Sequence, residues 1–367
     1  MQIDFANLKI QHNLYKEEIE EAILKVARDC NFIMGSQIDE LERNLEKFTG
    51  SKYAISCSSG TDALLLAMMA LDIQPDDEII TTPFTFFATA ETIAFLKAKP
   101  VFVDIDEKTY NIDPKKIEEK ITSKTKAIIP VSLYGQPADM DEINQIAKKY
   151  NLKVIVDGAQ SFGSTYKGIS DSNLGDISCT SFFPAKPLGC YGDGGALFTN
   201  DEKLADKIKS LRLHGQSIRY HHQYIGMGGR LDTIQAAVLN VKLKYYEKDL
   251  KLRQDVAEKY TKALNAKNIE TPFVKNDRTS AWAQYSIRVQ NRTELQTKLQ
   301  NLGIPTAVHY PMPLHVQECF KYLNLKEGDF PISEKVSKEI MSLPMNPYVS
   351  DEEIEFIVEN LAKELRC

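Results

Sequence analysis

Short runs of apolar, often β-branched residues alternate with amphipathic stretches through the first two thirds of the chain. Such runs are typical of strands buried on both faces of a sheet, and the stretches between them have the periodicity of helices. This alternation predicts an α/β domain with a mainly parallel sheet. The predicted strands cover residues 53–56, 77–81, 99–104, 126–132, 153–157, 177–183 and 195–199.

The predicted helices lie between these strands, and most follow a capping Asp, Thr or Asn. They cover residues 61–71, 88–96, 140–150 and 202–211. After Arg230 the pattern changes to a long helical segment over 233–264, followed by a strand-like AQYSIRV and a final helix over 352–365. We therefore predict a large α/β domain over residues 1–240 and a small α+β domain over residues 241–367.

The composition and charge favour a small-molecule partner. The chain has 367 residues, 43% of them hydrophobic, which is enough for a full core. The net charge of -6 arises from 45 basic and 51 acidic residues that are interleaved, so we expect neither a nucleic-acid partner nor a membrane partner. The amino terminus contains no apolar stretch of signal-peptide or membrane-spanning length, and we expect a cytoplasmic protein.

The cysteines and histidines do not predict a metal site. The cysteines contain no CxxC pair, which favours reduced thiols. Three histidines, at 214, 221 and 222, lie close together in the sequence, but adjacent histidines rarely converge on one ion and no carboxylate or thiol spacing supports them. The cysteines are Cys30, Cys57, Cys179, Cys190, Cys319 and Cys367.

A candidate anion site lies in SSGTDALLL, where a strand-like segment runs into Ser59, Gly60 and Thr61 and then into a helix. Free backbone N–H groups and a hydroxyl meet at the start of that helix, which is the arrangement that binds phosphate. An ordinary helix N-cap is the alternative interpretation of this segment taken alone.

Asp157 and Lys186 are the candidate chemical groups. Asp157 follows KVIV, so its carboxylate lies at the carboxyl end of a buried strand, where open α/β sheets bind their ligands. Lys186 lies in the Pro- and Gly-rich loop of SFFPAKPLGCYGDGGA. A helix cap and a solvated loop lysine are the simpler alternatives. Together with the Ser59 to Thr61 segment, however, they supply an amine for a Schiff base, a carboxylate for a pyridine nitrogen and a phosphate site.

With these residues in this order, the sequence resembles the fold type I pyridoxal 5'-phosphate (PLP) enzymes, and specifically the DegT/DnrJ/EryC1/StrS family of nucleotide-sugar aminotransferases. The resemblance runs nearly end to end. It implies an aspartate aminotransferase-like fold, with a large, mainly parallel seven-stranded sheet domain and a small C-terminal α+β domain. The motifs that carry it are SSGTDA, TPFTFFATAE, PVFVDID, IIPVSLYGQPADM, VDGAQSFG, SFFPAKPLGCYGDGGA, LRLHGQ, GRLDTIQAAVL and IPTAVHYP.

The resemblance also implies roles for individual residues. Lys186 would hold the cofactor and, once freed, act as general base and acid. Asp157 would pair with the pyridinium, Gln160 would hydrogen-bond the phenolic oxygen, and Phe86 would stack on the ring. The phosphate would be held by Gly60, Thr61 and Ser181, and the substrate side would be lined by Arg230 from the neighbouring subunit, His309 and Tyr310.

Some of these roles have simpler alternatives. Phe86 is apolar enough to be plain core, and Arg230 has the usual alternative of a surface ion pair. His309 and Tyr310 have the alternative of domain-interface packing. The sequence also departs from the family at Gly228, where relatives often carry an Asn that reaches the cofactor phosphate across the dimer; a backbone amide of Gly228 or Gly229 could replace that side chain.

Within the family, the sequence is most similar to enzymes that act at C3 of UDP-2-acetamido-3-keto sugars, either the uronate of O-antigen pathways or the 3-keto-N-acetylglucosamine of lipid A pathways. The implied reaction moves an amino group from L-glutamate, which leaves as 2-oxoglutarate, to the sugar ketone in a homodimer with shared active sites. The alternative is a C3 or C4 aminotransferase for a dTDP- or UDP-keto-6-deoxysugar. Intact Lys186 disfavours a sugar dehydratase, and the lack of GxGxxG disfavours a nicotinamide enzyme.

Overall fold

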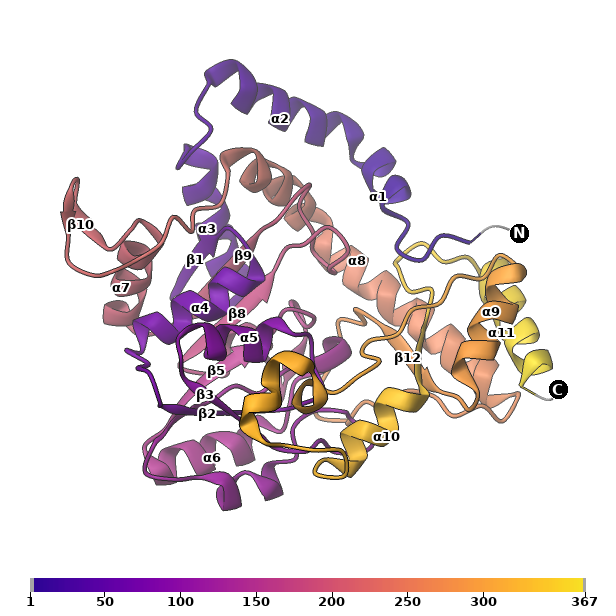
Figure 1. The fold of residues 1–367 in the computed structure, drawn as a ribbon. Helices are drawn as coiled ribbons and strands as arrows, with labels where there is room; N and C mark the ends of the chain where they lie inside the picture. The colour runs from indigo at the N-terminus through magenta and orange to yellow at the C-terminus, as the bar shows by residue number, and fades with distance from the viewer. Residues whose placement is uncertain (1–2, 366–367) are drawn as a thin grey trace.

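A seven-stranded sheet forms the centre of the molecule in the computed structural model, which describes residues 3–365. Its strand order is β1-β9-β8-β5-β4-β2-β3 (Figure 1). The strands from β8 to β3 are parallel, whereas β9 runs antiparallel to both β1 and β8. The mainly parallel sheet predicted from the sequence is thereby confirmed. The strands are β1 (Tyr53–Cys57), β2 (Glu78–Thr81), β3 (Lys99–Phe102), β4 (Thr125–Ile128), β5 (Lys153–Asp157), β8 (Ile177–Ser181) and β9 (Gly195–Thr199).

Helices cover both faces of this sheet because its strands are apolar on both sides. Ile155 packs in the same core cluster as helices α4, α5 and α7, whereas its neighbours Val154 and Val156 pack with α6 on the opposite face. Helix α3 packs on β1 and α8. The bounds are α3 (Ser36–Thr49), α4 (Gly60–Ala70), α5 (Ala88–Phe95), α6 (Met140–Tyr150), α7 (Glu202–Arg212) and α8 (Thr233–Asn265).

Helix α8 joins the sheet domain to the C-terminal part of the molecule. Its 33 residues span about 50 Å. Leu239 and Tyr246 pack in a core cluster with α3 and the sheet, and Val256 and Tyr260 pack in a second cluster farther along the helix. The predicted long helix is confirmed, whereas the predicted domain boundary after residue 240 stays a prediction.

The C-terminal part contains a two-stranded antiparallel sheet covered by helices. The predicted AQYSIRV strand and the predicted final helix are both confirmed. The elements of this part are β12 (Tyr285–Arg288), α9 (Arg292–Asn301), α10 (Pro331–Glu339), β13 (Ile340–Leu343) and α11 (Asp351–Glu364). Figure 1 shows β12, α9 and α11 around the far end of α8, whereas α10 lies closer to the sheet domain, against which its Val336 packs.

Further short elements are not predicted by the sequence pattern. Two helices precede α3, and two small antiparallel strand pairs lie outside the main sheet. The hairpin of β10 and β11 projects from the molecule near α7 (Figure 1). These elements are α1 (Leu8–Leu14), α2 (Lys16–Asp29), β6 (Thr165–Tyr166), β7 (Ile169–Ser170), β10 (Gln216–Ile218) and β11 (His221–His222).

Three predicted strands end earlier than expected. β3 ends at Phe102 instead of residue 104. The regular pairing of the runs 126–132 and 177–183 ends at Ile128 and Ser181, although Val131 keeps an isolated parallel bridge to Asp157. In the runs 126–132 and 177–183, the apolar residues Val131 and Phe183 lie past the end of the strand and line a cavity at this edge of the sheet. The apolar pattern therefore includes site residues as well as strand residues.

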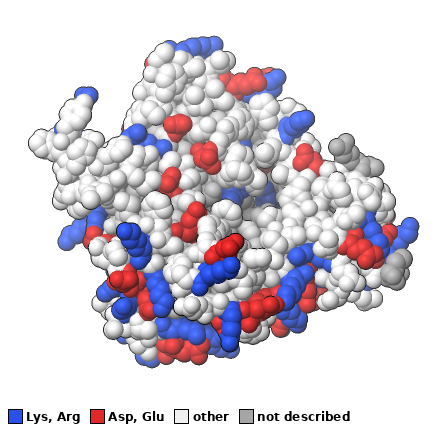
Figure 2. Space-filling model, in the orientation of Figure 1, with Lys and Arg blue, Asp and Glu red and all other residues white. Residues whose placement is uncertain are grey.

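The surface carries mixed charges. Figure 2 shows acidic and basic side chains side by side over much of the visible face. Within residues 3–365, no helix is long and apolar enough to cross a membrane. The five cysteines in this range are free thiols, and Cys367 lies outside the described residues.

Candidate active site

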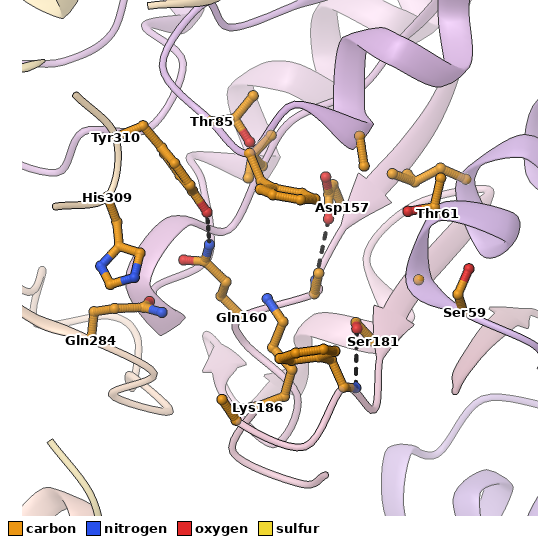
Figure 3. Close-up of a pocket in the computed structure, with 18 of the residues that line it drawn as sticks. Ser59, Thr61, Thr85, Asp157, Gln160, Ser181, Lys186, Gln284, His309 and Tyr310 are labelled. Atoms are coloured by element: carbon orange, nitrogen blue, oxygen red, sulfur yellow. Dashed lines mark hydrogen bonds between the residues drawn. The ribbon is translucent and has the colours of Figure 1, made fainter. Parts of the chain in front are cut away.

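A cavity of about 490 Å³ opens at the carboxyl ends of the parallel strands. Asp157 comes from the end of β5, and Lys186 from the loop that joins β8 to β9. His309 and Tyr310 close the cavity from the C-terminal part of the chain (Figure 3). The cavity thus collects residues from most of the length of the chain, from Ser59 to Tyr310.

The loop that carries Lys186 is tightly turned. The Lys186 amide donates to the Phe183 carbonyl at 2.8 Å, and the Cys190 amide donates to the Phe182 carbonyl at 2.8 Å. Gly189 is required here, since a Cβ at this position would lie 2.4 Å from the Pro184 carbonyl oxygen. Burial lowers the pKa of the Lys186 ammonium, an effect that the nearby Asp157 opposes. The amine is therefore more readily deprotonated than a surface lysine.

Asp157 is buried and has few partners. Its Oδ2 accepts from the Thr89 hydroxyl at 2.7 Å, and its Oδ1 accepts from the Ala159 amide at 3.3 Å. Burial raises the pKa of the Asp157 carboxyl, although the Thr89 and Ala159 hydrogen bonds and Lys186 lower it. A buried carboxylate of this kind is stabilised by a cationic ligand, so it fits a protonated ring nitrogen.

The anion cradle is formed where helix α4 begins. Ser59 is the N-cap, and its hydroxyl accepts from the Asp62 amide at 3.0 Å. Gly60 lies so close to the end of β8 that a Cβ on it would be 2.6 Å from the Ser181 Cβ. The hydroxyls of Thr61 and Ser181 line the same end of the cavity. The helix dipole, the free N–H groups and these hydroxyls fit a phosphate group.

Phe86 and Gln160 line the middle of the cavity. Phe86 is 54% exposed, which rules out the alternative that it is plain core. The Gln160 side chain is held at both ends, because its Oε1 accepts from the Tyr134 amide at 2.7 Å and its Nε2 donates to the Tyr310 hydroxyl at 3.0 Å. The second hydrogen on Nε2 remains for a ligand. The Tyr310 ring lies 6.0 Å from the Phe86 ring.

His309 is neutral in this environment. Burial and the nearby Lys186 lower the pKa of its imidazole to about 4. Its Nδ1 is 2.9 Å from the Ser342 hydroxyl, and its backbone carbonyl accepts from the Tyr134 hydroxyl. The ring therefore faces the cavity as a hydrogen-bonding group without charge.

Arg230, in contrast, is not among the described residues that line this cavity. It lies beside Gly228, where an added Cβ would be 3.7 Å from an Arg230 terminal nitrogen and 3.1 Å from His214 Cε1. A side chain at position 228 would therefore press on the exposed His214 ring, which would have to move by a few tenths of an ångström.

Several residues of the cavity could not be identified from the sequence. Thr89 supports Asp157, and Thr85 contacts Thr89 through their hydroxyls at 3.1 Å. Phe183 is 51% exposed beside Lys186, and Gln284 reaches the cavity from the segment before β12. Phe183 belongs to a run predicted as strand, and Gln284 lies in no motif with local chemistry. Only the assembled fold places them together.

The fold and the cavity together define a PLP enzyme of fold type I. The profile of the DegT/DnrJ/EryC1/StrS aminotransferase family matches residues 13–362, so the chain belongs to that family. The expected family, fold and enzyme class are thereby confirmed.

Two curated relatives and one solved structure illustrate the similarity. The UDP-2-acetamido-2-deoxy-3-oxo-D-glucuronate aminotransferase of Pseudomonas aeruginosa is 51% identical over 97% of this chain and 98% of its own. The UDP-N-acetyl-3-dehydro-alpha-D-glucosamine 3-aminotransferase of Acidithiobacillus ferrooxidans is 38% identical over 96% and 95%. The Bacillus subtilis NtdA structure, with bound cofactor PMP, is 31% identical with a TM-score of 0.92 and covers 100% of this chain and 86% of its own. PMP is the aminated form of PLP, which agrees with the predicted cofactor.

Proposed function

We propose that this protein transfers an amino group from L-glutamate to the C3 ketone of a UDP-2-acetamido-2-deoxy-3-keto-glucose type sugar, for lipopolysaccharide biosynthesis. The observation that supports it most is the joint placement of Lys186, Asp157 and the α4 cradle in one cavity. The 51% identical relative favours the uronic acid form of the sugar over the hydroxymethyl form.

Each residue of the cavity has a defined task in this reaction. Bound PLP would supply an aldehyde carbon that takes up the amino group and a ring that spreads negative charge. Lys186 would hold the cofactor and then carry a proton to and from the substrate carbon. Asp157 would keep the ring nitrogen protonated, and the α4 cradle with Ser181 would fix the phosphate. Phe86 would cover one ring face and exclude water from it.

Side-by-side assays test the proposed substrate. The UDP-3-keto uronate and the UDP-3-keto-N-acetylglucosamine would each be made in place by a coupled dehydrogenase, with L-glutamate as donor. We expect release of 2-oxoglutarate with both sugars and a higher kcat/KM with the uronate. The proposal fails if neither sugar raises the release of 2-oxoglutarate above the one equivalent per subunit that glutamate alone yields, and the preference for the uronate fails if the second sugar reacts faster.

We further propose a homodimer in which Arg230 of one subunit reaches the cavity of the other. Large apolar side chains remain exposed near Arg230 in the chain, with Ile225 93% exposed and Ile218 of the projecting hairpin 70% exposed. A monomer rarely leaves such groups in contact with water together. Arg230 supplies a bidentate cation suited to a carboxylate.

Arg230→Ala should raise the KM for L-glutamate by about 10- to 100-fold, the value of a charge-assisted hydrogen bond. Steady-state kinetics with saturating sugar would measure it. Arg43→Ala, which removes an exposed arginine from α3, is the matched control and should leave this KM unchanged.

Mixed dimers locate the arginine. Subunits with Lys186→Ala and subunits with Arg230→Ala, unfolded and refolded together, should regain about a quarter of wild-type activity at low glutamate, because half of the dimers have one intact shared site. Activity no higher than that of the Arg230→Ala subunits alone would show that Arg230 serves the cavity of its own chain.

A further inference from the structure

The carboxamide of Gln284 faces the cavity without a partner that fixes it. Figure 3 shows its amide group pointing into the cavity beside the His309 ring. In this orientation of the amide, Oε1 is shielded from the cavity and accepts a hydrogen bond from none of the residues that the structure describes. Buried polar side-chain atoms are nearly always paired, so this oxygen requires an explanation.

The other glutamine of the cavity provides a contrast. Gln160 is held at both ends of its amide by Tyr134 and Tyr310. The terminal torsion of a glutamine is soft and close to two-fold, so an amide held by nothing can turn by half and present either its NH2 group or its oxygen. Gln160 is therefore fixed in one role, whereas Gln284 is free to serve as donor or acceptor.

The position of Gln284 favours a contact with the substrate over a contact with the cofactor phosphate. In Figure 3 it lies with His309 and Tyr310 on one side of Lys186, and Ser59, Thr61 and Ser181 lie on the other side. The phosphate cradle is formed by the latter group. A group at the His309 end therefore meets whatever is attached to the reacting carbon.

The two substrates can present different hydrogen-bonding groups at that place. Glutamate presents carboxylates, which only accept, whereas a 2-acetamido keto sugar presents O–H and N–H groups, which donate. We propose that Gln284 contacts both substrates in turn, donating its N–H to a carboxylate of the amino donor and accepting, through Oε1, from an O–H or N–H of the sugar. This inference rests on the proposed function and assigns a specificity residue to it.

Two substitutions separate the roles. Gln284→Met removes both donor and acceptor at similar volume, and Gln284→Glu keeps only the acceptor. In a two-step exchange, kcat/KM for each substrate reports its own half-reaction. We expect kcat/KM for glutamate to fall by about 10- to 100-fold in both variants, since a carboxylate loses a charge-assisted bond. For the sugar we expect a loss of about 3- to 10-fold in Gln284→Met and a loss below about 3-fold in Gln284→Glu.

Gln254→Met is the matched control. The Gln254 side chain accepts a hydrogen bond at 2.7 Å from the indole of Trp282, which lies two residues before Gln284 in the chain. Gln254 does not line the cavity. This variant should leave both kcat/KM values within about twofold, because no contact to either substrate is lost.

The alternative is that Gln284 serves only the fold. A void of about 20 Å³ on its other side has room for one water, which could pair with Oε1. In that case Gln284→Met would lower the melting temperature and reduce both kcat/KM values equally, with no difference between the Met and Glu variants. That result, or unchanged kinetics in Gln284→Met, overturns the inference. Failure of the wild-type protein to aminate either sugar would overturn the proposed function instead.

Discussion

Lys186→Ala should reduce transamination by at least about 10³-fold, because in the proposed mechanism it removes both the attachment of the cofactor and the group that moves the proton. Burial lowers the pKa of this ammonium, which raises the fraction of the neutral amine that can attack an aldehyde. Release of 2-oxoglutarate from L-glutamate in a single turnover would measure the loss.

A second measurement identifies the attachment site directly. Borohydride reduction of the wild-type holoenzyme should leave a pyridoxyl group on the peptide that contains Lys186, and the same treatment of Lys186→Ala should leave none. Lys126→Ala, which changes an exposed lysine on β4, should keep both activity and labelling. Turnover at the normal rate in Lys186→Ala would contradict the proposed mechanism as a whole.

Asp157→Asn should lower kcat by about 10²- to 10³-fold, the range for loss of one preorganised electrostatic partner in a site closed to water. Asparagine has nearly the same shape but carries no charge to hold the ring nitrogen protonated. The steady-state rate with both substrates saturating would measure the effect. An unchanged kcat would mean that the ring charge is maintained by another group.

The same substitution should not destabilise the cofactor-free protein. Burial raises the pKa of Asp157 above its usual 3.8, so the ionised carboxylate opposes folding. This opposition is absent below pH 3.8 and develops as the pH rises through the pKa of the folded state. Thermal unfolding without cofactor should therefore show Asp157→Asn gaining stability relative to wild type as the pH rises from about 4 to about 8. A variant that loses stability over that interval would show that the Thr89 and Ala159 hydrogen bonds outweigh the cost of burial.

The strands of the main sheet could be predicted because their short apolar runs are typical of strands that are buried on both faces. In the run 153–157, for example, Val154 and Val156 pack against one helical layer and Ile155 against the other, so every residue of the run after Lys153 is buried. The antiparallel insertion of β9 between β1 and β8 could not be predicted, because an apolar run such as 195–199 carries no direction. Pairing is decided by the assembled fold.

The residues of the candidate site also fall into two groups, those that the sequence predicts and those that it does not. Asp157 and Lys186 stand out because a carboxylate at a strand end and a lysine between glycines and prolines are unusual locally. Thr89 and Gln284 do not, since a threonine in a helix and a glutamine before a strand are ordinary until the chain brings them to the cavity. Their roles depend on contacts between residues far apart in the chain. Thr89 and Asp157, for example, are 68 residues apart.

The uninterrupted course of α8 constrains how ligands are exchanged. The helix contains neither proline nor glycine between Thr233 and Asn265, and it is anchored in a separate core at each end. A hinge motion between the sheet domain and the C-terminal part would have to break backbone hydrogen bonds within α8, since sharp bends in helices usually occur at proline or glycine. In the proposed reaction, the exchange of the amino donor for the sugar nucleotide therefore depends on side chains and loops at the entrance of the cavity, while the two ends of α8 keep their relative positions.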